Sequence, residues 1–423
     1  MNTQPATSFR PAVEPLRNAI RIKPVIVHRA FCDRCLAEMR MDEILWQGIH
    51  VCVVMHCAQC QTEVIEDLPA GHAIEAQFRV DLKNNLLLGD EGASRRWFGA
   101  PLLESLSSPK SGEVELRVEK FREARKVVIL NCLDFLYGHA LLKLLNADQH
   151  LRQPGEAGLV VIIQPFLRWL VPDGVAEIWT VELPLAQARS HFPRLHQRIA
   201  RECERFDAVY VSVAHPHPSD FHIVNFTRVE PHDFWSSRFR ITFIWRQDRP
   251  WWSGDLMRRA ARRIKPLRAL LLWQNLRVRR LFSRMRRRFP RATLTVAGLG
   301  RSTRFPAWID DRRVERFDDE SEREACRIYA ESRLIIGVHG SNMLLPSAHA
   351  GITIDLMPND RWKNMAQDVL YQSLDDRWTE DARMISLRHH YLPLDISTRS
   401  LFQAAKSMLE YYAEAHLHFQ TLP

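Results

Sequence analysis

Four cysteines near the start of the chain are spaced as metal ligands. Cys32 and Cys35 form one Cys-x-x-Cys pair, and Cys57 and Cys60 form a second. Such a pair bends tightly enough to point two thiolates at one ion, and two pairs complete a tetrahedron. Four thiolates leave no open coordination position, so the spacing predicts a zinc ribbon whose metal is structural. The alternative is a set of reduced, buried cysteines.

A segment at 131–141, with the sequence NCLDFLYGHAL, holds two residues suited to proton transfer. It follows an apolar run and opens a helical pattern, and Gly138 lets the backbone turn tightly between them. Asp134 and His139 would lie at this turn, where either could take a proton from an acceptor hydroxyl. The alternative is an ordinary strand–helix turn in which Asp134 caps the helix and His139 is packed.

A second segment, LIIGVHGSNMLLP at 334–346, runs from a buried strand into a polar turn. Gly340 permits close approach of the backbone, and Ser341 and Asn342 would cap the helix that follows. The free N–H groups of that helix would then bind phosphate, with His339 as a further donor. A purely structural helix cap is the alternative.

Between these segments the sequence FIWRQDR, at 243–249, ends another apolar run. Arg246 and Arg249 could neutralise the charge that develops on a departing nucleotide diphosphate. Asp248 could hold one of the two guanidinium groups in position. The alternative is a cluster of ion pairs on the surface.

The elements that must position these residues are short apolar strands separated by helices. This alternation predicts an α/β fold with parallel sheets covered on both faces. It occurs twice, which predicts two Rossmann-like lobes facing a cleft at the carboxyl ends of their strands. The strands are expected at 127–130, 159–163, 177–181 and 208–213, and then at 241–245, 292–297, 314–316, 334–338 and 353–356.

The same pattern divides the chain into six parts. The cysteine pairs mark a small module, and a Gly-, Ser- and Pro-containing stretch separates that module from the first lobe. The expected parts are a flexible arm (1–24), the zinc ribbon (25–75), a linker or irregular subdomain (76–120), the first lobe (121–235), the second, donor-binding lobe (236–396) and a terminal helix (397–423).

The chain of 423 residues has a formal net charge of +9, and the excess gathers at 258–288, where basic and apolar residues alternate at helical spacing. A solvated basic helix face explains this pattern, and an anionic membrane surface or nucleic acid is the alternative partner. No apolar run reaches the roughly 18 residues that a membrane span needs. The expected location is the cytoplasm, and the basic helix would allow peripheral contact with the inner face of the membrane.

The segment 246–358 resembles the C-terminal lobe of glycosyltransferase family 61. In that family a strand ending in Arg-x-x-Arg opens the lobe, which here is Arg246 and Arg249. An acidic helix then leads to a strand and a turn that begins His-Gly, here His339 and Gly340. The lobe later contains a strand that ends in a carboxylate before proline, here Asp355. The resemblance covers about a quarter of the chain.

Two departures from the family pattern are visible. Ser341 and Asn342 stand in place of Ala-Gly, and Asp355 stands where a glutamate is usual. The zinc ribbon is foreign to the family.

The resemblance implies a GT-B fold and an inverting, metal-independent transfer of a sugar to a hydroxyl of a glycan, protein or small molecule. The nucleotide-sugar donor would bind mainly in the second lobe, where Asp355 would reach its ribose or sugar. The base would come from the first lobe, as Asp134 or His139. A protein or carrier partner would bind the zinc ribbon. Two other readings stay open: a zinc-ribbon nucleic-acid-binding protein, and a non-catalytic glycosyltransferase-like recognition scaffold.

Overall fold

The computed structural model describes residues 16–153, 155, 157–218, 221–233, 236–251, 267–364, 370 and 388–420. The chain divides into two compact units, Met1–Asp220 (unit 1) and Phe221–Pro423 (unit 2). The boundary precedes the one predicted at 235/236, because α5 (Ile223–Thr227) packs within unit 2. There the Thr227 hydroxyl lies 2.9 Å from Nε2 of His349. Residues 1–15 of the predicted arm lie outside the described residues.

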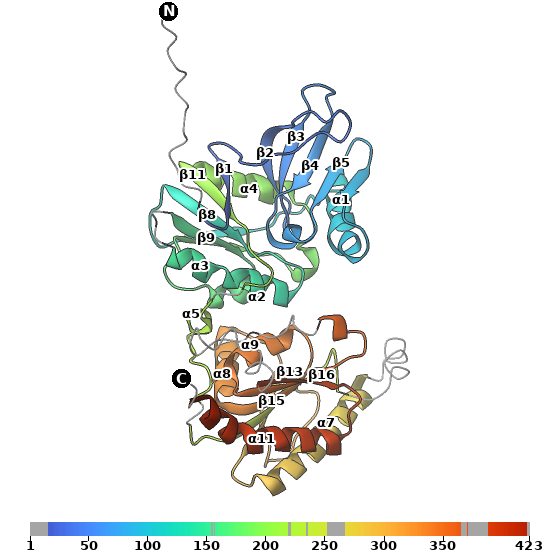
Figure 1. The fold of residues 1–423 in the computed structure, drawn as a ribbon, viewed down its shortest axis with the longest axis vertical. Helices are drawn as coiled ribbons and strands as arrows, with labels where there is room; N and C mark the ends of the chain where they lie inside the picture. The colour runs from blue at the N-terminus through green and yellow to red at the C-terminus, as the bar shows by residue number, and fades with distance from the viewer. Residues whose placement is uncertain are drawn as a thin grey trace, which may run out of the picture. The chain divides into compact units, whose positions relative to one another are not determined.

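Unit 1 contains a central sheet of six strands (Figure 1). The four inner strands are parallel and buried on both faces, which is why they read as continuous apolar runs and were predictable from sequence. Helices α2 and α3 pack against strands of this sheet. Helix α4 packs against it too, and also against a second sheet of unit 1 that is described below. In spatial order the strands are β1 (Ala19–Lys23), β11 (Ala208–Ser212), β8 (Lys126–Asn131), β9 (Gly158–Ile163), β10 (Glu177–Val181) and β7 (Leu116–Lys120), and the helices are α2 (Tyr137–Leu145), α3 (Ala147–Arg152), η3 (Pro165–Leu170), η4 (Leu185–Gln187) and α4 (Pro193–Glu204).

Both edges of the central sheet differ from the prediction. Strand β1 lies in the predicted arm and pairs antiparallel with β11, and β7 lies in the predicted linker and pairs antiparallel with β10. Each is a five-residue strand, AIRIK or LRVEK, with polar side chains on one side. Such a short alternation is a weak signal, and pairing with a buried neighbour decides that it becomes a strand.

The cysteine pairs belong to a second, antiparallel sheet in unit 1, which we call the ribbon sheet. It extends past the predicted end at residue 75, because two further strands add a hairpin to it. Met39, Trp46 and Val53 of this region share one hydrophobic core with Val127 and Trp179 of the central sheet. The ribbon is therefore a part of unit 1 and not a separate module. Its elements are β2 (Arg40–Trp46), β3 (Val51–His56), β4 (Glu63–Asp67), η1 (Gly71–Ile74), β5 (Phe78–Asp81), β6 (Leu86–Gly89), the π-helix η2 (Arg95–Gly99) and α1 (Ala100–Ser107).

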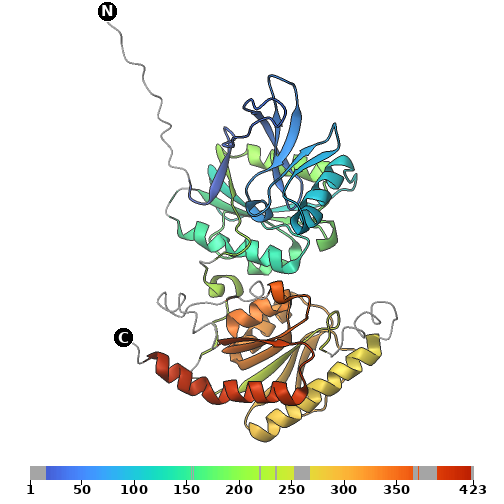
Figure 2. The same ribbon diagram turned by 45° about the vertical axis from the view of Figure 1, so that its right-hand side comes forward.

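Unit 2 contains one sheet of six parallel strands. Numbered by appearance in the chain, the spatial order is 3-2-1-4-5-6, the order of dinucleotide-binding folds. Helices α7 and α11 cover one face, and α8 and α9 cover the other (Figure 2). In spatial order the strands are β14 (Asp310–Val314), β13 (Thr293–Leu299), β12 (Arg240–Trp245), β15 (Ser332–Val338), β16 (Ile352–Met357) and β17 (His389–Pro393).

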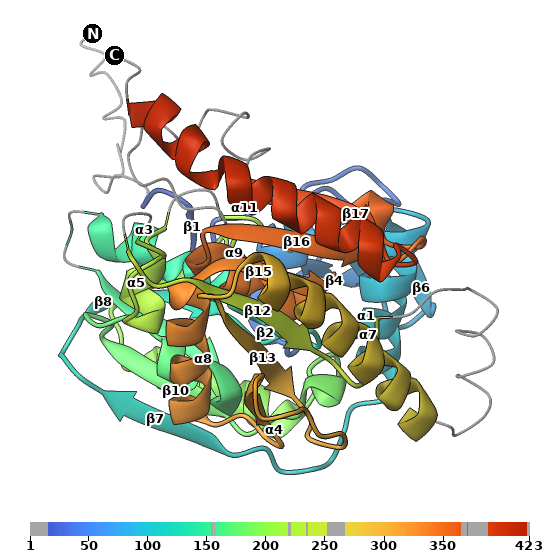
Figure 3. The same ribbon diagram turned by 90° about the horizontal axis from the view of Figure 1, so that it is seen from below.

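The helices of unit 2 follow the prediction closely where they are described. The long basic helix and the terminal helix pack against each other on the sheet (Figure 3). The first part of the predicted basic stretch, at 258–266, lies outside the described residues. Within the described part of the chain, no helix is both long and apolar enough to cross a membrane. The helices are α7 (Leu267–Arg288), α8 (Asp319–Glu331), η5 (Ser341–Met343), α9 (Leu344–His349) and α11 (Thr398–Gln420).

Candidate functional site

The four cysteines of the two pairs converge as predicted. All four sulfur atoms lie within 4.8 Å of one another. Cys32 and Cys60 are 3.5 Å apart, Cys35 and Cys57 are 3.3 Å apart, and Cys35 and Cys60 are 3.7 Å apart. A tetrahedral ion bonded at about 2.3 Å sets sulfur–sulfur separations of roughly 3.8 Å. The cluster could therefore hold a metal ion with little rearrangement.

The two cysteine turns are built alike. In each, the residue after the second cysteine is left-handed: Leu36 has φ 61° and Gln61 has φ 57°. The amide of that residue donates to the carbonyl of the first cysteine, with Leu36 bonded to Cys32 and Gln61 bonded to Cys57, both at 2.9 Å. A left-handed residue other than glycine costs roughly 1–2 kcal/mol. These strained turns are therefore the part of the ribbon sheet that most depends on a bound ion.

Removal of a metal ion held by the four cysteines should loosen the two turns and spare the sheet. Hydrogen exchange at the Leu36 and Gln61 amides should accelerate by more than about tenfold after chelation or in Cys57→Ser. The amide of Val53 should stay protected, since its side chain belongs to the core shared with the central sheet. Mass-spectrometric exchange together with metal analysis checks this. Cys203→Ala removes a buried thiol outside the cluster and should change neither, whereas melting of all of unit 1 would contradict the prediction.

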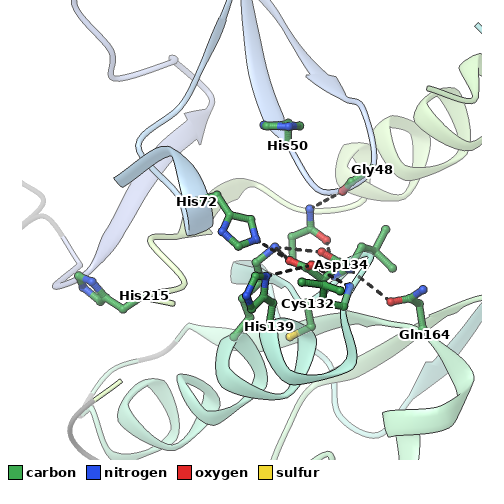
Figure 4. A network of polar contacts seen from close by, with 12 residues as sticks. Gly48, His50, His72, Cys132, Asp134, His139, Gln164 and His215 are labelled. Atoms are coloured by element: carbon green, nitrogen blue, oxygen red, sulfur yellow. Dashed lines mark hydrogen bonds and ion pairs between the residues drawn. The ribbon is translucent and has the colours of Figure 1, made fainter. Parts of the chain in front are cut away.

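A second polar cluster of unit 1 lies at the carboxyl end of β8. Strands β9 and β10 follow on one side of β8 and β11 lies on the other, so the ends of β8 and β11 flank the point where the strand order reverses. Asp134 follows β8 directly. The Gly71 amide donates to the Val213 carbonyl at 2.7 Å, which ties η1 to the segment after β11. His72 is thereby brought against Asp134 (Figure 4).

The Asp134 carboxylate is fully buried and contacts four groups. Its Oδ2 lies 2.7 Å from Nε2 of His72 and 2.9 Å from Nζ of Lys143. Its Oδ1 accepts from the Leu136 amide at 3.1 Å and lies 3.5 Å from Nδ1 of His139. The Lys143 side chain is only 1% exposed. Asp134 and Lys143 therefore form a buried ion pair between two imidazole rings.

The charges in this cluster follow from its burial. Burial alone would raise the pKa of Asp134, but the Lys143 ammonium, then contacts with His139 and His72, outweigh it and hold the pKa well below its usual range. Burial lowers the pKa of His72 to about 4, against the opposite effect of Asp134. His72 is therefore neutral at pH 7, and its contact with a carboxylate assigns the proton to Nε2.

His139 is better placed than Asp134 to meet a substrate. Its side chain is 31% exposed, whereas the Asp134 side chain is 0% exposed. The Nδ1 atom of His139 is buried toward Asp134, which leaves Nε2 for a hydroxyl group. An imidazole oriented by a carboxylate is the usual arrangement of a general base. The sequence left a candidate base open between the two residues. Of the two, His139 is the one that solvent reaches, and the Asp134 carboxylate faces its Nδ1 atom at 3.5 Å without a hydrogen bond between them.

Aromatic side chains surround the His139 ring. Phe135 meets it edge-on at 6.1 Å between ring centroids, and Trp97 stacks on Phe135 at 6.0 Å. The Arg189 guanidinium lies over the Phe135 ring, 4.2 Å from its centroid. Trp97 remains 48% exposed. It belongs to the π-helix η2, a rare conformation that is frequent at functional sites.

His72, Asp134 and His139 also carry ligand-type atoms within 4.8 Å of one another. The Lys143 ammonium already lies against Oδ2 of Asp134, so the carboxylate charge is balanced without a metal ion. A divalent ion at the same oxygen would be repelled by this fixed charge. The arrangement is therefore better suited to proton transfer than to metal binding.

Two members of this cluster were not found from the sequence. His72 lies 62 residues before Asp134, in a 3-10 turn that carries no recognisable motif. Lys143 did carry a signal, because it is a single charge within the apolar helix sequence ALLKLL. A buried lysine requires a nearby carboxylate, and Asp134 was the available candidate.

In unit 2 the predicted arginines and the 339–342 turn lie where the strand order reverses, at the ends of β12 and β15, whereas Asp355 lies within β16. Arg246 binds Asp248 through two hydrogen bonds, of 3.0 Å and 2.5 Å, and also contacts Oδ1 of Asn342. Arg249 donates to the His339 carbonyl at 2.8 Å. The side-chain amide of Gln274, in α7, donates a hydrogen bond to the Arg246 carbonyl at 3.0 Å. The two arginines thus bracket the turn after β15.

Gly340 is the residue that lets both arginines approach that turn. Its φ of +149° is one that side chains rarely adopt. A Cβ atom there would stand 2.4 Å from Nη1 of Arg246 and 3.0 Å from Nη1 of Arg249. Nδ2 of Asn342 is buried beside them and has no hydrogen-bond partner among the described residues. Two guanidinium groups and an amide donor thus lie together at a glycine turn, a set of donors of the kind that binds anions.

The predicted roles of His339 and Asp355 require correction. His339 is 1% exposed and Asp355 is 0% exposed, and Nδ1 of His339 lies 2.8 Å from Oδ2 of Asp355. His389 of β17, whose pKa burial lowers to about 3, lies 3.7 Å from the same oxygen. The buried contacts that His339 and His389 make with Asp355 therefore help to hold the turn after β15 in place. A fully buried carboxylate is not placed to reach a ribose or sugar, as was expected of Asp355.

The predicted helix cap is also absent at this turn. Neither Ser341 nor Asn342 caps α9 through its side chain, and Asn342 bonds Arg246 instead. The Met343 amide is already bonded to the Gly340 carbonyl at 2.7 Å. The helix that follows has only six residues. Positive charge for an anion therefore comes from the arginines and not from free helix amides.

The predicted residues thus form two local groups. Asp134 and His139 lie together in unit 1, and in unit 2 Arg246 and Arg249 lie at the Gly340 turn. A scan of the chain against protein-family models and a search of the curated proteins each found no match.

Proposed function

We propose that the chain is a glycosyltransferase that transfers a sugar from a nucleotide donor to a hydroxyl group, by inversion and without a catalytic metal. The observation that carries the proposal is the pair of guanidinium groups of Arg246 and Arg249 at Gly340, where the strand order of unit 2 reverses. Open α/β sheets bind nucleotides at such points. The resemblance of 246–358 to glycosyltransferase family 61 supports the same assignment, with a GT-B arrangement of the two units.

The donor diphosphate is assigned to unit 2. Arg246 and Arg249 supply the positive charge that a departing nucleoside diphosphate needs, and charged hydrogen bonds of this kind are about twice as strong as neutral ones. Nδ2 of Asn342 supplies a further donor. Gly340 admits a phosphate close to the backbone, since it has no side chain to exclude it.

The proton acceptor is assigned to unit 1. Nε2 of His139 takes the proton of the acceptor hydroxyl. The hydroxyl oxygen forms a bond to the anomeric carbon of the donor sugar while the bond from that carbon to the nucleoside diphosphate breaks. Asp134 orients the ring and stabilises the imidazolium that forms. The exposed Trp97 offers a flat apolar surface to an acceptor sugar beside this residue.

The metal of the four cysteines is assigned to zinc, with a structural role. Four thiolates at tetrahedral spacing are the preferred ligands of zinc, and they leave no position for substrate. Cys32, Cys35, Cys57 and Cys60 would hold it and thereby close the two turns at the end of the ribbon sheet.

Nucleoside diphosphate binding tests the assignment of unit 2. Isothermal titration with UDP, GDP and ADP should show binding of at least one of them to the wild-type chain. Arg246→Met should weaken that binding by about 1.5–3 kcal/mol, or roughly 10- to 150-fold, since it removes a charged hydrogen bond to phosphate. Arg327→Met removes an exposed arginine of α8 that pairs with Glu324, and it should leave binding unchanged.

A turnover assay tests the transfer reaction itself. A panel of nucleotide sugars with simple sugar and peptide acceptors should show release of the nucleoside diphosphate that bound best. If none of the nucleotides or nucleotide sugars binds, the donor site is wrong. If they bind but no donor is consumed, the chain is a recognition scaffold and not an enzyme.

A further inference from the structure

The exposed face of α7 carries an uneven pattern of side chains. Leu272, Trp273 and Leu276 are 52%, 42% and 41% exposed. Arg279 and Arg280 are exposed on the next turn. Exposed residues at these spacings lie on one face of a helix. The face is therefore apolar toward its N-terminal half and cationic toward its C-terminal half.

The opposite face of α7 accounts for its place in the fold. Leu271, Val278, Phe282 and Met285 are buried in the core of unit 2. The helix is thus already anchored to the sheet, with α11 beside it (Figure 3). Among the described residues of unit 2, packing gives no reason for three large apolar side chains on the outer face. Single exposed apolar residues are common, but three within five positions form a patch.

The charge of the cationic half is largely uncompensated within the helix. The 22 residues of α7 include no acidic residue. Arg288 pairs with Glu410 of α11, but no carboxylate in the described part of the chain lies in ion-pair range of Arg279, Arg280 or Arg287. Arginines in the last turn also complement the helix dipole, which explains Arg287 and Arg288. That effect fades within one turn, so it does not explain Arg279 or Arg280.

We propose that this face of α7 is a docking surface for an anionic lipid membrane. Leu272, Trp273 and Leu276 would enter the boundary between headgroups and acyl chains, where tryptophan is favoured, and Arg279 and Arg280 would contact anionic headgroups. The nine residues from Leu272 to Arg280 span about 12 Å along the helix axis, which one lipid patch can cover. Nucleic acid would match the arginines but offers no partner for the leucines. The surface does not depend on the proposed enzymatic function.

Sedimentation of the full chain with lipid vesicles tests this surface. The chain should bind vesicles that contain phosphatidylglycerol and not vesicles of phosphatidylcholine alone. Raising the salt from about 0.1 M to about 1 M shortens the Debye length from about 10 Å to about 3 Å and should release it. Leu272→Ser/Trp273→Ser/Leu276→Ser and Arg279→Gln/Arg280→Gln should each weaken binding by about tenfold or more.

A matched control separates this surface from general positive charge. Arg194→Gln/Arg201→Gln removes two exposed arginines from α4 of unit 1 and should leave vesicle binding unchanged. Thermal melting should show that all variants fold, since every substituted side chain is exposed. Absence of vesicle binding, or binding that ignores the α7 substitutions, would overturn the proposal. So would binding of duplex DNA that needs the arginines and not the apolar residues, because the partner would then be nucleic acid.

Discussion

Asp134→Asn is expected to lower the free energy of unfolding of unit 1 by about 3–5 kcal/mol. The substitution keeps the shape of the side chain but removes its charge, so the Lys143 ammonium is left buried without a carboxylate at 2.9 Å. An uncompensated buried charge costs far more than the loss of an ordinary hydrogen bond. Denaturant unfolding, with hydrogen exchange of the β8 amides as the probe, measures the effect in unit 1 separately from unit 2.

Two further variants make that result specific. Asp134→Asn/Lys143→Met removes both charges and should recover part of the lost stability, since an amide beside a thioether no longer leaves a buried ion. Asp207→Asn removes an exposed carboxylate that lies 3.8 Å from Arg125, and it should change stability by less than about 0.5 kcal/mol. A small effect of Asp134→Asn, or a double variant that is less stable than the single one, would mean that the ion pair does not carry this part of the fold.

His139→Gln is expected to lower kcat by about 10²–10⁴-fold, the usual contribution of a general base. The affinity for a nucleoside diphosphate should stay the same, because the imidazole acts on the acceptor and is assigned no contact with the donor. The side chain is 31% exposed, so the fold should tolerate its replacement. Steady-state turnover and titration calorimetry on the same preparation separate the two effects.

The control for His139 is a histidine of similar exposure elsewhere in unit 1. His56 of β3 is 33% exposed and pairs with Asp42, so His56→Gln should leave kcat unchanged. His72→Gln retains a donor to Asp134 and should reduce kcat less than His139→Gln does, as expected of a residue that acts through Asp134. Equal losses in the two variants would show that His139 has no special role, and a selective loss in His72→Gln would move the base to His72.

Several features of the protein were decided by the sequence alone, because their signals are local. The two Cys-x-x-Cys pairs predicted a four-sulfur cluster, since ligand spacing within a turn is enough to aim two thiolates at one point. The buried parallel strands were predicted because both faces of each are apolar, as in β9 and β15. The polar turns at Asp134 and Gly340 were located because each directly follows such a strand.

Other features depended on pairing between distant parts of the chain. The edge strands β1 and β7 carry weak patterns and exist because a buried neighbour offers them a ladder of hydrogen bonds. The ribbon was expected to be a separate module, but its apolar face fits the core of the central sheet. A local pattern does not show where an apolar face will pack. For this reason the predicted end of the ribbon at residue 75 and the predicted boundary at 235/236 both differ from the structure.

The roles of the site residues were decided by tertiary structure for the same reason. The sequence located Asp134, His139, His339 and Asp355 but did not show which of them would be exposed. Folding buries Asp134 against Lys143 and His72, and it buries Asp355 against His339, while leaving His139 in contact with solvent. The sequence specifies a residue's chemical type, but its solvent access and many of its partners arise only when distant segments come together, as with His72 and Asp134, 62 residues apart.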